Sequence, residues 1–106
     1  MEWLYPWVPV EALGPQFAAM FEEVLKREVA PGHKLYGIPV QAIGKRDISD
    51  DVLFRLLDGT GRVAEVHLTW TNSPPERPPW PGTGIFNSLE EWAEESMRPD
   101  HEQFRE

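Results

Sequence analysis

Two runs of alternating hydrophobic residues on either side of a glycine-rich turn constrain this chain more than any other feature. The runs are DVLFRLL (51–57) and RVAEVHLTW (62–70), and the sequence DGTG between them is typical of a β-hairpin. A pairing shifted by one residue would turn every hydrophobic side chain to the wrong face, so the register is well determined. The pattern predicts an antiparallel hairpin in which Phe54 lies opposite Ala64.

The same register gathers polar side chains on the second face of this hairpin. It places Asp51 opposite His67, and the β-carbons of such cross-strand neighbours lie about 5 Å apart. The other predicted pairs are Val52 with Val66, Leu53 with Glu65, and Arg55 with Val63. We expect the face with Asp51, Arg55, Glu65 and His67 to be open to a partner or to a second copy of the chain.

One more strand and one helix come before the hairpin. The sequence IPVQAIG (38–44) predicts the first strand of a three-stranded antiparallel meander, and Pro39 marks either its start or an exposed edge. Hydrophobic residues recur every three or four positions from Pro15 to about Glu28, which predicts a helix.

The two ends of the chain give different signals. Residues 1–14 combine aromatic residues with prolines, which predicts an extended strap across the domain or part of a contact surface. Ser88 with Glu91 three residues later forms a capping box, which predicts the start of a C-terminal helix. We expect that helix to end at Pro99 and residues 99–106 to form a frayed acidic tail.

These elements predict an α+β fold in which a helix, a three-stranded antiparallel meander, a proline-rich loop and a C-terminal helix follow one another. A chain of 106 residues has room for one hydrophobic core, so residues 1–106 are expected to form a single domain. Both helices are expected to cover one face of the sheet.

The proline-rich loop SPPERPPWPGTG (73–84) joins the hairpin to the C-terminal helix. Repeated prolines favour a stiff, extended chain, and Trp80 between two of them resembles the aromatic anchors of protein interfaces. In the alternative that we favour, Trp80 packs inward over the sheet beside Trp70 and Phe86. The candidates for a binding surface are Trp70, Trp80, Arg55 and Glu65.

Composition argues against several classes of function. A net charge of -8 disfavours binding to the phosphate backbone of nucleic acids and fits either solubility or attraction of a basic partner. The chain has no cysteine, and its histidines show no metal-binding spacing, so neither a metal site nor another cofactor is expected. An apolar N-terminus without a basic leader is neither a signal peptide nor a membrane span, which predicts a cytoplasmic protein without membrane contact.

His67 and Asp51 are the one pair that we predict to have the chemistry of an acid–base site. A carboxylate that orients a histidine is half of a hydrolase triad, in which His67 and Asp51 would be the catalytic residues. No nucleophile motif accompanies the pair, so we favour a cross-strand ion pair or a partly buried histidine over catalysis.

Residues 31–92 resemble a family of small uncharacterised bacterial proteins. The resemblance lies in the sequences GHKLYG (32–37) and VHLTW (66–70), and in the step from WP at Trp80 to Phe86 before the last helix. It implies a bacterial, cytoplasmic, single-domain protein and assigns no catalytic residue.

The sequence therefore favours a non-enzymatic protein-interaction module with an unidentified protein partner. Its negative charge, its aromatic and proline-rich segments and the lack of a catalytic motif support this hypothesis. The alternative is a small hydrolase that uses His67 and Asp51. Self-association through the open sheet face, or through the strand that contains Pro39, is compatible with either function.

Overall fold

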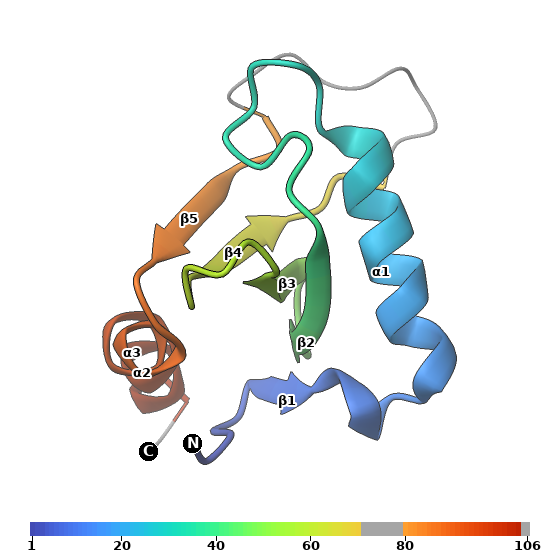
Figure 1. The fold of residues 1–106 in the computed structure, drawn as a ribbon. Helices are drawn as coiled ribbons and strands as arrows, with labels where there is room; N and C mark the ends of the chain where they lie inside the picture. The colour runs from blue at the N-terminus through green and yellow to red at the C-terminus, as the bar shows by residue number, and fades with distance from the viewer. Residues whose placement is uncertain (71–79, 105–106) are drawn as a thin grey trace.

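The computed structural model describes residues 1–70 and 80–104 and has an α+β fold (Figure 1). Its five strands form one antiparallel sheet in the order β1-β2-β3-β4-β5. The strands are β1 (Trp7–Pro9), β2 (Val40–Arg46), β3 (Asp51–Leu56), β4 (Val63–His67) and β5 (Thr83–Phe86). The helices are α1 (Pro15–Glu28), α2 (Leu89–Trp92) and α3 (Arg98–Glu102), with short helical turns at Val10–Ala12 (η1) and Ala93–Met97 (η2).

The central hairpin and the first helix are confirmed. β3 and β4 pair with Phe54 opposite Ala64 and with Asp51 opposite His67, which is the predicted register. Helix α1 has the predicted ends. Local alternation and helical periodicity were sufficient here because each of these elements packs its hydrophobic side into one core.

The prediction of a three-stranded meander is wrong, because the sheet has five strands. Trp7–Pro9, expected as part of a strap, pairs with β2 so that Trp7 lies opposite Arg46. The end of the proline-rich loop forms β5, where Thr83 lies opposite Val66. Both segments are too short, or too rich in proline and glycine, to show alternation. Their backbone N–H and C=O groups nevertheless find partners at the edges of the meander.

The helices cover opposite faces of the sheet, and not one face as expected (Figure 1). Helix α1 packs on the face that carries Val52, Phe54 and Val66, whereas α2 and η2 pack on the face that carries Leu53 and Val63. Leu53 and Val63 are fully buried, and leaving such side chains in water would cost about 1.5–3 kcal/mol each. The second face is therefore a second core and not an open surface. Its buried members include Trp7, Trp92 and Met97.

The C-terminal helix begins as predicted. The hydroxyl of Ser88 accepts a hydrogen bond of 3.0 Å from the N–H of Glu91. The carboxylate of Glu91 reaches back and accepts a hydrogen bond of 2.6 Å from the N–H of Asn87. The first bond satisfies an N–H group that a helix start otherwise leaves without a partner, and the second fixes the residue before the cap.

The prediction that this helix ends at Pro99 is wrong. The wider π-type turn at Ala93–Met97 comes directly before α3, so Pro99 occupies the first turn of a new helical segment. Proline is tolerated in the first turn of a helical segment, and here the wider π-type turn comes directly before it. The segment expected to be a frayed tail is helical as far as Glu102, and residues 105–106 lie outside the described part of the chain.

Candidate functional site

His67 and Asp51 lie side by side at the ends of β4 and β3, as the register predicts. His67 Nδ1 lies 3.1 Å from Asp51 Oδ1. On the other side of the carboxylate, the hydroxyl of Ser49 donates a hydrogen bond of 2.6 Å to Asp51 Oδ2. The side chain of His67 is 61% exposed, so the pair lies on the surface of the molecule.

This arrangement does not have the order of a catalytic triad. In a triad the nucleophilic hydroxyl contacts one histidine nitrogen and the carboxylate contacts the other. Here the hydroxyl of Ser49 donates to the carboxylate of Asp51. Neither of the two pockets described below is lined by His67. The geometry is that of an exposed cross-strand contact, which contributes little to stability in water.

The C-terminal helix covers Glu65. Its Oε1 accepts a hydrogen bond of 2.8 Å from the indole Nε1 of Trp92 and one of 2.6 Å from the hydroxyl of Ser96. The carboxylate therefore joins β4 to the C-terminal helix inside the fold. Glu65 was predicted as a binding-surface residue; it is partly exposed, and its Oε1 accepts hydrogen bonds from two side chains of the C-terminal helix.

Trp80 lies on the surface, contrary to the inward packing that the sequence favoured. It is 58% exposed, whereas the next residue, Pro81, is fully buried. The carbonyl oxygen of Pro81 accepts hydrogen bonds from His33 Nε2 at 3.0 Å and from the hydroxyl of Thr83 at 2.9 Å. His33 is itself buried, and its Nδ1 accepts a hydrogen bond of 3.0 Å from the N–H of Leu35. The exposed indole of Trp80 is therefore followed by a buried proline whose carbonyl oxygen accepts two hydrogen bonds.

Trp70 is 39% exposed and has a backbone conformation that costs energy. Its φ of 58° lies in the left-handed region, which residues with a bulky side chain rarely adopt. The buried carboxylate of Glu28 accepts hydrogen bonds from the N–H groups of Thr69 at 2.9 Å and Trp70 at 2.8 Å. The indole also packs edge-on against Phe21, with ring centres 6.0 Å apart. Of the proline-rich loop (73–84), residues 73–79 lie outside the described residues.

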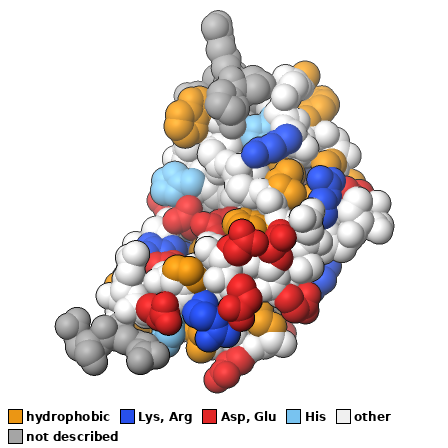
Figure 2. Space-filling model, turned by 90° about the vertical axis from the view of Figure 1, so that its left-hand side faces the viewer, with side chains coloured by type: hydrophobic (Ala, Val, Ile, Leu, Met, Phe, Trp, Pro, Cys, Tyr) orange, Lys and Arg blue, Asp and Glu red, His pale blue; other side chains and the backbone are white. Residues whose placement is uncertain are grey.

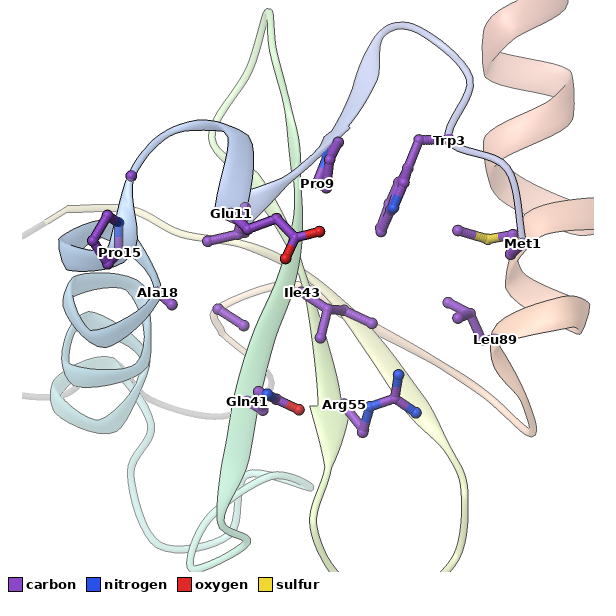
Figure 3. Close-up of a pocket in the computed structure, with 13 residues that line it drawn as sticks. Met1, Trp3, Pro9, Glu11, Pro15, Ala18, Gln41, Ile43, Arg55 and Leu89 are labelled. Carbon is purple, nitrogen blue, oxygen red and sulfur yellow. The ribbon is translucent and has the colours of Figure 1, made fainter.

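A pocket of about 370 Å³ opens between the N-terminal segment, the start of α1, and strands β2 and β3 (Figure 3). Trp3, Pro9 and Ile43 contribute to its apolar lining. Glu11, Gln41 and Arg55 contribute long polar side chains. We call the cavity lined by these six residues the N-terminal pocket.

The three polar side chains reach this pocket from different elements. Glu11 comes from η1, whereas Gln41 and Arg55 are direct cross-strand partners on β2 and β3. The face of the hairpin marked Arg55 as a candidate in the sequence, but no local pattern marks Glu11 or Gln41. Glu11 reaches Gln41 and Arg55 only because the N-terminal segment pairs with β2, a pairing that was not predicted from the sequence.

A second groove, of about 750 Å³, runs between α1 and residues 35–40. Leu25, Val29 and Ile38 contribute to its apolar lining. The carboxylate of Glu22 at its edge accepts a hydrogen bond of 2.9 Å from the N–H of Ala42. This acid is therefore used within the fold, whereas Glu23, Lys26 and Tyr36 contribute further polar side chains to the lining of the groove.

Acidic side chains gather on the face that the C-terminal helix forms (Figure 2). The exposed acids of this helix are Glu90, Glu94, Glu95 and Glu102. Glu94 forms a salt bridge of 3.0 Å with Arg98, and both side chains are well exposed to solvent. This face therefore presents negative charge to any approaching molecule.

Comparison of the chain with models of protein families, with curated proteins and with solved structures gave no match. The resemblance noted for residues 31–92 therefore rests on its short sequences alone. Within residues 1–70 and 80–104, no helix combines the length and the hydropathy needed to cross a bilayer, and no three histidine or acidic side chains are grouped to hold a metal ion.

Proposed function

We propose that this protein is a non-enzymatic interaction module that binds a basic protein in the cytoplasm through the surface around Trp80. The exposure of the Trp80 indole is the observation that carries this proposal. Tryptophan is enriched among the few residues that dominate the free energy of binding at protein interfaces. A large apolar ring that is 58% exposed contributes little to folding, whereas its burial by a partner would be favourable.

The backbone that presents Trp80 is held before any partner arrives. Pro81 is buried, and its carbonyl oxygen accepts hydrogen bonds from His33 and Thr83. A side chain that stands on a fixed backbone loses less conformational entropy on binding than one on a flexible loop. This support favours Trp80 over the other exposed hydrophobic residues as the centre of the interface.

The charge of the chain favours a basic partner. The net charge is -8, and acidic side chains gather over the C-terminal helix (Figure 2). Opposite charges on two proteins raise their rate of association and suppress the wrong partners. Binding should therefore weaken when the salt concentration rises.

Affinity capture from the native host tests this proposal, with the wild-type protein, Trp80→Ala and Leu57→Ala as baits. Leu57 is 50% exposed and serves as the matched control for loss of an exposed hydrophobic side chain. We expect the wild type and Leu57→Ala to capture the same basic protein. Its affinity for Trp80→Ala should be lower by about tenfold or more, which corresponds to about 1.4 kcal/mol.

Two outcomes contradict the proposal at different points. Equal capture by all three baits would show that Trp80 does not contribute to the interface. If the wild type captures no specific protein, the proposed interaction function itself is contradicted.

The hydrolase alternative has one contact in its favour, the 3.1 Å distance between His67 Nδ1 and Asp51 Oδ1. It predicts that the protein cleaves ester or amide substrates and that His67→Ala abolishes the cleavage, as removal of a triad histidine does. Hydrolysis assays with both proteins test it. A rate that does not depend on His67 contradicts the alternative.

A further inference from the structure

We propose that the N-terminal pocket binds a small zwitterion with an apolar side chain, such as a free hydrophobic amino acid. The pocket is lined by a carboxylate, a guanidinium and an amide around apolar residues (Figure 3). Neither Trp80 nor Trp70 lines this pocket. This ligand site is therefore independent of the proposed protein interaction.

Two opposite charges line the pocket without neutralising each other. Glu11 and Arg55 are absent from the salt bridges formed within residues 1–70 and 80–104. Their side chains, and that of Gln41, are likewise absent from the side-chain hydrogen bonds of those residues; Glu11 and Gln41 are exposed to solvent, and Arg55 is partly exposed. A ligand that carries both charges satisfies the carboxylate and the guanidinium together.

Arg55 and Gln41 form the end of the site that binds the carboxylate of the ligand. They are direct cross-strand partners, so their β-carbons lie about 5 Å apart on one face of the sheet. A guanidinium presents a fork of N–H donors that matches the two oxygens of a carboxylate, and the amide of Gln41 adds a further donor. Arg55 is only partly exposed, so its charge is screened less than that of a side chain in open water.

Glu11 forms the end that binds the ammonium group. It comes from η1, and Figure 3 shows Ile43 between Glu11 on one side and Gln41 and Arg55 on the other. A carboxylate at this end accepts hydrogen bonds from an ammonium group. It also repels a second carboxylate, so the site selects zwitterions over dicarboxylates.

The apolar lining and the size of the pocket define the rest of the ligand. Trp3, Pro9 and Ile43 offer apolar surface to a side chain that has no polar groups. A volume of about 370 Å³ is near the lower end of the range for ligand pockets, which is about 300–1,000 Å³. A free amino acid matches this size better than a nucleotide or another large cofactor.

NMR titration of the wild-type protein tests the site with three related probes. L-Leucine carries both charges, N-acetyl-L-leucine lacks the ammonium group, and L-leucinamide lacks the carboxylate. We expect L-leucine to shift the resonances of the Trp3 indole N–H, the Gln41 side-chain amide and the Ile43 methyl groups. We expect it to bind at least about tenfold more tightly than either of the other probes, because each lacks one charge-assisted contact.

Variants at the two ends of the site provide the second measurement. Arg55→Gln and Glu11→Gln should each weaken the binding of L-leucine by about tenfold or more. Arg27→Gln and Glu95→Gln make the same changes of charge at exposed positions outside the pocket and should leave the affinity unchanged. Trp80→Ala should also leave it unchanged, which separates this test from that of the proposed function.

Two results overturn the inference. One is that millimolar L-leucine shifts no resonance of the pocket residues in the wild-type protein. The other is that N-acetyl-L-leucine or L-leucinamide binds as tightly as L-leucine. Both results come from the wild-type protein, so the test holds even where a variant does not fold.

Discussion

The carboxylate of Asp100 and the guanidinium of Arg46 join α3 to β2 through two parallel hydrogen bonds, Nε to Oδ2 at 2.7 Å and Nη2 to Oδ1 at 2.8 Å. Asp100 Oδ2 also accepts a hydrogen bond of 3.0 Å from the indole Nε1 of Trp7. The hydrogen bonds from Arg46, followed by its positive charge, hold the pKa of Asp100 below its ordinary value. The same pairing raises the pKa of Arg46.

The low pKa of Asp100 predicts a loss of stability in acid. Because the pKa is lower in the folded state than in the unfolded state, the stabilisation is complete above the unfolded value of about 3.9 and is lost as the pH falls through the folded value. We expect Asp100→Asn to lower the free energy of unfolding by about 1–3 kcal/mol at pH 7. The difference from the wild type should shrink below about pH 4. Urea unfolding at a series of pH values measures both effects.

The matched control for Asp100→Asn is Glu95→Gln, which removes an exposed acid of the same helical region. It should change the free energy of unfolding by less than about 0.5 kcal/mol. A difference between wild type and Asp100→Asn that stays constant down to pH 2 would contradict the proposed role of Asp100.

Gly44 is required because the ring of Trp3 lies on its backbone. A β-carbon at this position would lie 2.6 Å and 2.7 Å from two ring carbons of Trp3. We expect Gly44→Ala to lower the free energy of unfolding by about 1–3 kcal/mol, as overpacking does. The cost should largely disappear in a Trp3→Ala background, which a double-mutant cycle measures.

A second strand glycine gives the comparison for Gly44. A β-carbon on Gly84 would lie 3.5 Å from the ring of Phe86, which is an ordinary contact. Gly84→Ala should therefore be close to neutral. If Gly44→Ala is equally neutral, the close packing of Trp3 on this strand is wrong.

His33 holds the turn after α1 and the start of β5 together, and its loss should loosen both. His33→Ala removes the acceptor for the N–H of Leu35 and the ring donor to the carbonyl oxygen of Pro81. We expect a decrease in the free energy of unfolding of about 2–4 kcal/mol, because buried polar groups lose their partners. Hydrogen exchange at the Leu35 amide should also become faster. Unchanged protection of that amide would count against this role, and Lys34→Ala at an exposed position is the control.

Glu28 stabilises the left-handed backbone at Trp70. Its carboxylate accepts the N–H groups of Thr69 and Trp70, and glutamine offers one oxygen in place of two. We expect Glu28→Gln to cost about 1–3 kcal/mol in the free energy of unfolding and Glu28→Ala to cost more. Thermal or urea unfolding compares them with Glu23→Gln at an exposed position of the same helix. Equal stabilities of all three variants would rule out this function of Glu28.

Some elements of the fold could be predicted because their signals are local. Phe54 and Ala64 are paired by an alternation that tolerates no shift of one residue. Ser88 and Glu91 contact each other within one turn of helix. In these cases the interacting residues lie close in the chain or repeat with the period of one element.

The candidate site could be predicted only where it depends on the hairpin. The contact of His67 with Asp51 follows directly from the register. The orientation of Trp80 does not follow from the register. It depends on the hydrogen bond from His33 to the carbonyl oxygen of Pro81, which lies 48 residues further along the chain. Glu11 is similarly brought to the pocket by strand pairing at the far edge of the sheet.

The sequence by itself determined the α1 helix, the β3–β4 register and the cap at Ser88, because periodicity and capping act over a few residues. The tertiary structure decided that the sheet has five strands and that the C-terminal helix covers its second face. Both features depend on contacts between residues far apart in the chain. Arg46 and Asp100, for example, are separated by 54 residues. No local pattern encodes such a contact, because its two residues come together only when the whole chain folds.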